Sequence, residues 1–329
     1  MHLLVTGGAG FIGSNFIHHL LHKEKDIRIT NLDVLTYAGN IDNLKDVEKD
    51  PRYRFVQGDI TSIEDVEKAM EGVEAVIHFA AESHVDKSIT GPSVFVTTNV
   101  VGTQVLLETA RRRKIARYLQ VGTDEVYGSL KNDGTLFTEK TPLSPNSPYS
   151  ASKAGADLLV RSYFKTFGFP ALITRCSNNY GPYHFPEKFI PLMVTHLLEG
   201  KKIPVYGQGL NVRDWLHVCD HCEALWTVLK KGREGEVYNI GGHNEWRNID
   251  IARETLSIMG FDESMIDYVI DRPGHDLRYA IDASKIRDEL GWVPAYRFEE
   301  GLRETIQWYR SNEAWWKPLK ERNSTWKRL

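Results

Sequence analysis

Up to about residue 176, short apolar runs alternate with longer stretches in which apolar residues recur at helical spacing. Short apolar runs predict buried strands at 3–6, 27–32, 53–57, 75–79, 118–122 and 171–175. Between them, stretches with helical spacing predict helices at 11–21, 62–70, 94–113 and 151–167. Strands that alternate with helices of this length indicate a parallel sheet covered on both faces.

After Cys176 the pattern loosens, and prolines and aromatic residues cluster at 180–186. Helical spacing predicts further helices at 188–198, 220–230, 248–259, 284–290 and 298–310, with short strands between them. We therefore expect a nucleotide-binding domain at 1–176 and a smaller, mainly substrate-binding lobe at 177–329. This boundary is soft, because we expect the strand at 237–240 to return to the main sheet. The basic, aromatic tail at 315–329 is expected to be a packed or frayed terminus.

Composition narrows the class of protein. The chain has 329 residues, of which 41% are hydrophobic and 26% charged, as is usual for a soluble globular protein. A net charge of −3 provides no general attraction to nucleic acid or to an anionic membrane. The chain shows no signal-peptide pattern and no long apolar run, and it has only 3 cysteines. These features predict a cytoplasmic protein with neither a membrane nor a nucleic-acid partner.

A glycine-rich turn at residues 7–13 follows the first strand and opens the first helix. Glycine permits a positive φ and a close backbone approach to a pyrophosphate, while the helix N-terminus offers free N–H groups. Taken alone, the pattern also fits a tight turn without a ligand. Asp33, 20 residues after Gly13, is suited to bind the ribose hydroxyls of adenosine. No Arg or Lys at 34–40 could accept a 2′-phosphate, so NAD is favoured over NADP.

Tyr149 and Lys153 lie four residues apart at the start of a predicted helix, so they face the same side. A phenol has a pKa near 10 and is a poor base at neutral pH. A nearby ammonium and a positively charged nicotinamide would favour the phenolate, which could then take a proton from a sugar hydroxyl. The alternative is a surface pair that arose by chance.

Two adjacent carboxylates, Asp124 and Glu125, follow the fifth predicted strand. Open α/β sheets bind ligands at the carboxyl ends of their strands. Adjacent residues on a strand point to opposite faces, so both carboxylates reach one site only if the chain turns here. Two carboxylates beside a redox cofactor suggest an acid and a base whose pKa values are pushed apart. The alternative is a solvated acidic loop.

These motifs resemble a known superfamily. The glycine pattern, the segment 58–60, the Ala80–Ala81 pair, Asn99 and the Tyr–Lys pair are similar to those of the extended short-chain dehydrogenase/reductases. The segment Thr-Asp-Glu-Val-Tyr-Gly at 123–128 resembles the active-site strand of the dTDP-glucose 4,6-dehydratases. Related epimerases generally lack the acidic pair, and related GDP-mannose dehydratases and UDP-glucuronate decarboxylases usually have Ser in place of Asp124. The resemblance runs from Gly7 to about Tyr309. It implies an α/β fold with a Rossmann-type doubly wound parallel sheet and a smaller C-terminal substrate-binding lobe.

The resemblance also implies a reaction, the conversion of dTDP-glucose to dTDP-4-keto-6-deoxyglucose and water. Thr123 would bind the sugar 4-hydroxyl, and Tyr149, with Lys153 beside it, would deprotonate that hydroxyl as hydride passes from C4 to NAD. Glu125 would then remove the C5 proton, and Asp124 would protonate the departing C6 hydroxyl. The hydride returns to C6, so the enzyme is an NAD-dependent lyase whose cofactor ends unchanged.

The implied binding residues form two sets. The cofactor set is Gly7, Gly10, Phe11, Ile12, Gly13, Asp33, Thr36, Asp59, Ile60, Phe79, Ala80, Ala81, Ser83, Thr98, Asn99, Tyr149 and Lys153. The substrate set is Ser83, Thr123, Asn178, Glu187, Lys188, Phe189, Ile190, Pro191, Leu192, Pro204, Tyr206, Arg213, Asn248, Arg272 and His275. Within it, 187–192 with Pro204 and Tyr206 would form the nucleoside pocket. Members of the superfamily commonly dimerise through helices matching 94–113 and 151–167, so a homodimer is expected.

Two rival functions stay open. One is another NAD-dependent sugar-nucleotide epimerase or dehydratase, and the other is a non-catalytic NAD-binding protein, which would have no reason to keep the catalytic set together. Cys219-Asp220-His221-Cys222 has zinc-like spacing, but no second pair completes four ligands, so we predict no metal and two buried thiols at a helix start. His78 is predicted to be a packed core histidine near the cofactor.

Overall fold

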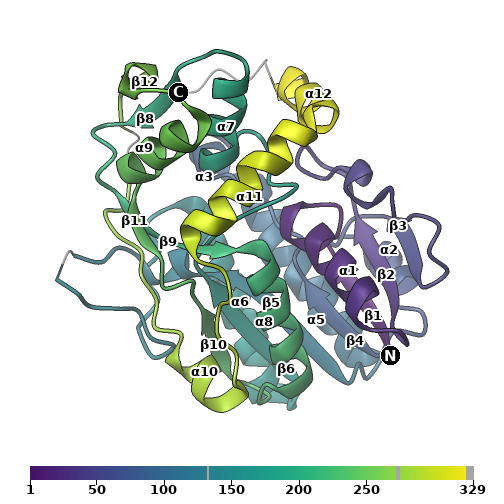
Figure 1. The fold of residues 1–329 in the computed structure, drawn as a ribbon. Coiled ribbons are helices and arrows are strands. Elements are labelled where there is room, and N and C mark those ends of the chain that lie inside the picture. The colour runs from purple at the N-terminus through teal and green to yellow at the C-terminus, as the bar shows by residue number, and fades with distance from the viewer. Residues whose placement is uncertain (132, 272–274, 324–329) are drawn as a thin grey trace.

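A central parallel sheet organises the molecule. The computed structural model describes residues 1–131, 133–271 and 275–323. Among these, seven strands form one sheet in the order β10-β6-β5-β4-β1-β2-β3, and every pair in it is parallel (Figure 1). The strands are β1 His2–Thr6, β2 Arg28–Asp33, β3 Tyr53–Gln57, β4 Ala75–His78, β5 Arg117–Thr123, β6 Ala171–Cys176 and β10 Val237–Ile240.

Helices cover both faces of the sheet because successive strand residues point to opposite sides. Leu3 and Val5 of β1 pack in one core with α1 Phe11–Lys23, α8 Val218–Lys231 and α10 Ser284–Leu290. Leu4, between them, packs in a second core with α2 Ile63–Ala69, α5 Thr103–Arg112 and α6 Pro148–Phe167. Burial on both faces explains why the strands have nearly continuous apolar sequences. The predicted α/β fold with a doubly wound parallel sheet is confirmed.

A smaller lobe packs around its own core beyond the carboxyl ends of the strands (Figure 1). Its sheets are β11-β9-β7 and β12-β8, formed by β7 Asn178–Tyr180, β8 Ile203–Tyr206, β9 Val212–His217, β11 Glu245–Arg247 and β12 Ile266–Val269. Its helices are α7 Phe189–Leu198, α9 Asn248–Met259, α11 Phe298–Ser311 and α12 Glu313–Asn323. The remaining helical segments of the described chain are η1 Ile41–Leu44, α3 Val85–Thr90, α4 Pro92–Phe95, η2 Val96–Gly102, η3 Asp124–Tyr127 and η4 Glu263–Met265.

Most predicted elements occur within a few residues of their expected ends, with two informative differences. The helix predicted at 94–113 is interrupted, because residues Val96–Gly102 form a π-helical segment between α4 and α5. A π segment widens the helix locally and is frequent beside functional sites. The tail is packed rather than frayed as far as Asn323, because α12 buries Trp316 completely.

The strand at 237–240 returns to the main sheet as expected, since β10 pairs with β6. The two lobes therefore do not divide cleanly along the chain, and the boundary at 176/177 stays a proposal. None of the helices in the described residues is both long and apolar enough to cross a membrane.

Candidate active site

One large cavity of about 930 Å³ lies between the carboxyl edge of the sheet and the smaller lobe. It brings together most of the predicted site residues. The predicted cofactor residues that line it are Gly7, Gly10, Phe11, Ile12, Gly13, Asp33, Thr36, Asp59, Ile60, Phe79, Ala80, Ala81, Ser83, Thr98, Tyr149 and Lys153. The predicted substrate residues that line it are Ser83, Thr123, Asn178, Glu187, Lys188, Phe189, Leu192, Pro204, Tyr206, Arg213, Asn248 and His275. Asp124 and Glu125 line the same cavity.

The glycine turn between β1 and α1 is closely packed. Gly7 has a φ of 72°, and a Cβ there would lie 2.6 Å from the backbone of Ala80. A Cβ on Gly13 would lie 2.4 Å from the carbonyl oxygen of Gly7. Helix α1 begins at Phe11, and its N-cap Gly10 makes no side-chain capping bond. The turn thus presents backbone and a helix N-terminus to the cavity, an arrangement suited to a phosphate group.

Asp33 ends β2 and is oriented by the glycine turn. Its Oδ2 accepts a hydrogen bond from Ala9 N at 2.9 Å, and its Oδ1 accepts one from Leu35 N at 2.8 Å. Burial raises the pKa of Asp33, and these two N–H groups oppose that rise. The side chain is therefore rigidly oriented at the cavity wall, where a carboxylate can accept hydroxyl groups and repel a phosphate.

The wall after β4 is held from behind by Asn99. Its Oδ1 accepts from Glu82 N at 2.9 Å, and its Nδ2 donates to Glu82 O and to Ser152 Oγ. Asn99 is buried and is not among the residues that line the cavity, so its place in the structure is that of a support behind the wall. Asp59 accepts from Thr61 N at 2.8 Å, which is the role of a turn residue, and it also lines the cavity.

The chain turns immediately after β5, as the sharing of one site by the two carboxylates requires. The 3₁₀ helix η3 begins at Asp124, and the Thr123 side chain caps it by accepting from Glu125 N at 3.3 Å. Both carboxylates consequently face the cavity. Burial, Glu125 and Asp214 raise the pKa of Asp124 well above its ordinary value, against the opposing charge of Arg213. Asp124 is thus suited to hold a proton.

Tyr149 and Lys153 lie in the first turns of α6, which a capping box at Ser147 and Ser150 begins. The Lys153 ammonium donates to Val121 O at 2.8 Å. Burial and the neighbouring Glu125 raise the pKa of Tyr149 well above 10. Without a further positive charge, Tyr149 is therefore a neutral phenol, and burial outweighs the effect expected from the lysine alone.

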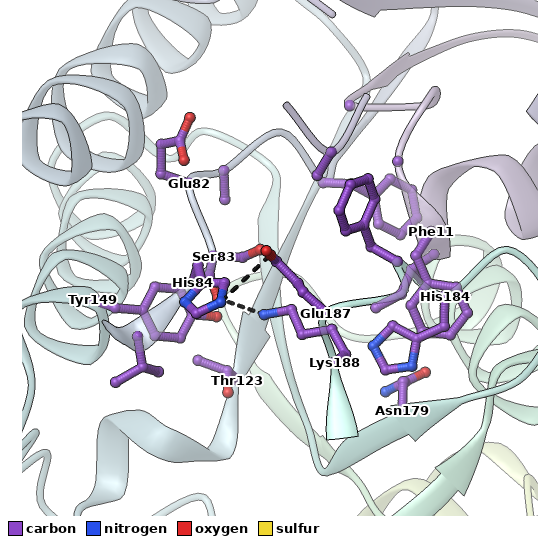
Figure 2. Close-up of a pocket in the computed structure, with 18 of the residues that line it drawn as sticks. Phe11, Glu82, Ser83, His84, Thr123, Tyr149, Asn179, His184, Glu187 and Lys188 are labelled. Carbon is purple, nitrogen blue, oxygen red and sulfur yellow. Dashed lines mark hydrogen bonds and ion pairs between the residues drawn. The ribbon is translucent and has the colours of Figure 1, made fainter. Parts of the chain in front are cut away.

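The loop before α7 crosses the cavity. Figure 2 shows Glu187 and Lys188 extending toward Ser83 and His84, while His184 lies against Phe11. Glu187 Oε1 lies 3.5 Å from His84 Nε2, and Lys188 Nζ donates to Ser83 O at 3.2 Å. The rings of His184 and Phe11 stack with centroids 4.2 Å apart. This loop thus contacts the glycine turn at one end and the wall after β4 at the other.

The nucleoside pocket as predicted needs one correction. Phe189, Leu192 and His196 of α7 face the cavity at helical spacing. Ile190 and Pro191 are buried on other sides of the helix, with Ile190 in the core of the lobe, so neither lines the cavity. The motif predicted a continuous lining segment, but the helix turns these two residues away.

Charged groups at the far end of the cavity are held by both backbone and side-chain partners. Arg213 is buried, donates to Asp276 O at 3.0 Å, and lies over the ring of Tyr279 at 4.2 Å. His275 Nδ1 lies 2.7 Å from Asp271 Oδ1. Arg272, another residue of the predicted substrate set, lies outside the described residues.

Comparison with known proteins identifies the family to which the chain belongs. The family described as GDP-mannose 4,6 dehydratase matches residues 4–305. A dTDP-glucose 4,6-dehydratase of Xanthomonas campestris pv. campestris is 53% identical over 332 residues, which cover 95% of this chain and 94% of that protein. The chain belongs to the dTDP-glucose 4,6-dehydratase family.

Solved structures of dTDP-glucose 4,6-dehydratases match over both lobes. The Bacillus anthracis enzyme, solved in complex with NAD, is 54% identical with a TM-score of 0.91, covering 97% of this chain and 99% of that one. The Streptomyces venezuelae enzyme, solved with NAD and TYD bound, is 53% identical with a TM-score of 0.94, covering 97% and 100%. The resemblance of residues 123–128 to this family, and of the fold to its Rossmann-type sheet, is confirmed.

Several residues that line the cavity of this dehydratase-family chain were not among the predicted site residues. They include Tyr37, Glu82, Cys176, His184, His196, Trp215, Tyr279 and Lys320. Lys320 comes from α12 and donates to Glu199 Oε2 at 2.9 Å, although the tail matched no motif. His184 lies in the cluster of prolines and aromatic residues at 180–186, and His196 lies in the helix predicted at 188–198. Tyr37 and Lys320 reach the cavity through tertiary contacts that no local pattern encodes.

The structure also describes His78 and the Cys219–Cys222 segment. His78 is buried, with Thr6 Oγ1 2.6 Å from Nδ1 and Thr103 Oγ1 3.1 Å from Nε2, and burial lowers its pKa to about 3. The prediction of a packed core histidine is confirmed. Cys222 is buried at the start of α8, but Cys219 is exposed, so the prediction of two buried thiols is wrong for Cys219.

Proposed function

We propose that this chain is an NAD-dependent dTDP-glucose 4,6-dehydratase, a hydro-lyase that forms dTDP-4-keto-6-deoxyglucose and water. The observation that carries the proposal is that the Asp124–Glu125 pair shares one cavity with Tyr149, Lys153 and the glycine turn. A binding protein needs no such acid and base set, and a reaction that only inverts C4 uses no acid for a leaving hydroxyl. The identity of about half of all residues to dTDP-glucose 4,6-dehydratases supports the same activity.

The residues present fit NAD. A turn in which a Cβ at Gly7 or Gly13 would strike backbone is built for a closely approaching pyrophosphate, and Asp33 is oriented for ribose hydroxyls. When bound, NAD supplies a hydride acceptor and, later, a hydride donor. The close relatives solved with NAD support this cofactor.

In the oxidation step, Tyr149 removes the proton of the sugar 4-hydroxyl, which Thr123 orients. Both side chains line the cavity beside each other, and Thr123 lowers the otherwise raised pKa of Tyr149 by hydrogen bonding. Lys153 provides the positive charge within this chain that favours the phenolate. The resulting 4-ketone makes the C5 proton acidic.

In the elimination step, Glu125 removes the C5 proton and Asp124 gives its proton to the C6 hydroxyl, which leaves as water. Asp124 suits the acid role because burial and the neighbouring Glu125 raise the pKa of its carboxyl well above the ordinary value, which favours the protonated form. The proton lost from C5 and the proton gained by the leaving hydroxyl are thus handled by neighbouring side chains on η3.

The remaining binding roles follow from position. We propose that Asn178 and Arg213 bind the diphosphate or sugar, and that Leu192, Pro204 and Tyr206 form the nucleoside pocket. Glu187 and Lys188 contact Ser83 and His84, so we place them nearer the sugar than the base. These binding residues lie in the proposed domain 177–329, whereas Ser83 and His84 belong to the proposed domain 1–176.

Product analysis tests the function. Purified protein is incubated with dTDP-glucose, and the product is identified by mass and by NMR. A 4-keto-6-deoxy sugar is expected, with a mass lower by one water. An unchanged mass with an inverted C4 would indicate an epimerase, and no turnover with retained NAD binding would indicate a binding protein.

The division of labour can be tested separately. Tyr149→Phe should reduce oxidation by about 10²–10⁴-fold. Glu125→Gln and Asp124→Asn should slow elimination more than oxidation, so a ketone should form without loss of water. Solvent deuterium should enter C5 through Glu125, and full deuterium entry in Glu125→Gln would require another base.

We also propose a homodimer. Apolar side chains are exposed on η2 and α6, the helical segments expected at a dimer contact: Val96, Val101, Leu158 and Phe167. A contact of this kind would remove these side chains from water. Sedimentation velocity should give twice the mass of the chain, and Val101→Glu with Leu158→Glu should give the monomer.

A further inference from the structure

A buried carboxylate lies behind the Tyr149–Lys153 pair and has no role in the reaction proposed above. Asp157 follows Lys153 by one helical turn on α6, so Tyr149, Lys153 and Asp157 share one side of the helix. It is only 1% exposed. A buried carboxylate this close to a site needs a partner or a purpose, because removing a charge from water is costly.

Within the part of the chain that the structure describes, only one oxygen of Asp157 has a hydrogen-bond partner. Its Oδ2 accepts from Arg175 Nε on β6 at 2.8 Å, and Arg175 Nη1 in turn donates to Tyr127 Oη at 3.0 Å. Its Oδ1 is buried and accepts no hydrogen bond from any residue that the structure describes. This oxygen lies against Gly122, where an added Cβ would come within 3.2 Å of it.

That position is next to the anchor of the lysine. Lys153 Nζ donates to the carbonyl of Val121, the residue before Gly122 on β5. The ammonium and the free carboxylate oxygen therefore meet the same two-residue segment of the strand. In a buried site, opposite charges interact strongly because little water screens them.

We propose that Asp157 is a positioning residue that holds Lys153 in its ammonium form behind Tyr149. The inference rests on the proposed roles of Tyr149 and Lys153, and it extends the Tyr–Lys pair to a third member on the same helix face. Its consequence is that the positive charge needed beside the phenol is maintained from within the protein.

The other groups around Lys153 do not supply this charge balance. On β4, burial lowers the pKa of His78 to about 3, so it is neutral. On β6, burial raises the pKa of the Cys176 thiol to about 12, so it is neutral too. The Asp124 and Glu125 carboxylates face Tyr149 from η3, and Arg175 adds a second cation beyond Asp157. Burial lowers the pKa of Lys153, and Asp157 is the principal group opposing that fall.

The test follows the charge of Lys153 itself. Full-length protein as purified is labelled with ¹³C at the lysine ε-carbon, and the Lys153 signal is identified by its absence from Lys153→Met. In Asp157→Asn the titration midpoint should fall by about one pH unit or more, a tenfold change in the acid constant. Asp157→Glu keeps the charge and should stay near the wild-type midpoint.

Arg175→Met gives a prediction of opposite sign. Without its arginine, Asp157 is less neutralised, so the Lys153 midpoint should rise. An unchanged midpoint in folded Asp157→Asn, or shifts of both variants in the same direction, would overturn the proposal. If Asp157→Asn does not fold, the double variant Asp157→Asn/Arg175→Met removes both charges of the buried pair, and its Lys153 midpoint must fall relative to that of Arg175→Met.

Turnover provides a separate readout. With dTDP-glucose, the alkaline limb of kcat/KM should move to lower pH in Asp157→Asn, whereas a merely structural role would lower the rate equally at every pH. The lysine titration needs no turnover. A failed dehydratase assay would therefore overturn the proposed function without deciding the role of Asp157. An unchanged Lys153 titration midpoint would overturn the role of Asp157 without deciding the proposed function.

Discussion

The two halves of the cavity are lined by different kinds of group. On the cofactor side, the lining is largely backbone: the glycine turn, the N-terminus of α1, and Asp33 held by two main-chain N–H groups. On the substrate side, the lining is side chains such as Arg213, Tyr206 and Asn248, carried by different strands and helices. A backbone site cannot be tuned by exchanging a side chain, whereas a side-chain site can be adjusted residue by residue. The cofactor half should therefore tolerate almost no added atoms, and the substrate half should respond in graded steps.

The largest effect should come from adding one carbon to the backbone site. In Gly13→Ala the new Cβ would lie 2.4 Å from Gly7 O and 2.7 Å from Gly8 Cα, both rigid backbone. Overpacking of this kind costs about 3 kcal/mol, so NAD affinity should fall roughly 100-fold by calorimetry. Gly10→Ala is the matched control, since its Cβ would meet only Gly7 O at 3.2 Å and should cost much less. Equal effects of the two changes would contradict a closely packed turn.

Asp33 tests a charged side chain on the cofactor side. Its carboxylate should repel a 2′-phosphate, so NADP should bind about 100-fold more weakly than NAD, since like charges brought together cost several kcal/mol. In Asp33→Ser the difference between the NAD and NADP affinities should decrease to about tenfold, because the repulsion of the 2′-phosphate is gone while the backbone site remains. Affinities for both dinucleotides are measured for each protein. Equal affinity of the unaltered chain for NAD and NADP would rule out the ribose role.

Arg213 tests the substrate side. In Arg213→Gln the KM for dTDP-glucose should rise roughly 10–100-fold, as expected for a lost hydrogen bond to a charged group, while NAD affinity stays unchanged. Arg247→Gln serves as the control, because Arg247 is exposed and pairs with Asp250 away from the cavity. Loss of NAD affinity in Arg213→Gln would mean that the two halves are not independent.

Nucleotide choice should give a smaller effect. UDP-glucose offers the same sugar hydroxyls, so discrimination falls to the pocket around Leu192, Pro204 and Tyr206. A methyl group in a fitted pocket is worth about 1–3 kcal/mol, and we expect dTDP-glucose to exceed UDP-glucose by at least roughly tenfold in kcat/KM. Side-by-side assays of dTDP-, UDP-, CDP- and GDP-glucose measure this. A faster rate with UDP- or CDP-glucose would keep the dehydration chemistry but change the substrate.

The smallest effect concerns stability. The pKa of Asp124 is raised in the folded state, so stability falls as pH rises from the unfolded pKa toward the folded one. Asp124→Asn carries no such titration and should be more stable at neutral pH, by roughly 1–2 kcal/mol as for other functional-site replacements. This gain in stability should disappear near pH 4, where the carboxyl of Asp124 becomes protonated in the unfolded state as well, and this loss provides the internal control. Thermal unfolding at both pH values measures it, and a destabilised variant at pH 7 would refute the protonated acid.

The same contrast between halves decides what could be predicted from the sequence. The cofactor side was visible because glycine spacing, strand ends and the Tyr149–Lys153 interval are local signals that need no knowledge of tertiary contacts. The turn at Asp124 was inferred only from the requirement that both carboxylates reach one site. In the structure the 3₁₀ helix η3 forms this turn. On the substrate side, only the resemblance pointed to 178–192. It could not show that α7 turns Ile190 inward, or that Lys320 returns from the tail, because both depend on packing between distant segments.

The strand order has a consequence for how the protein is made. The edge of β6 is covered only by β10, which the ribosome synthesises about 60 residues later, after much of the smaller lobe. Until then, the emerging chain exposes a row of unpaired peptide groups on an apolar strand, the kind of edge that recruits other strands. Domains usually fold as they emerge, but here the first 176 residues cannot complete their own sheet. Biosynthesis of this protein therefore includes an interval of vulnerability to aggregation, and that interval closes only when Val237–Ile240 leaves the ribosome.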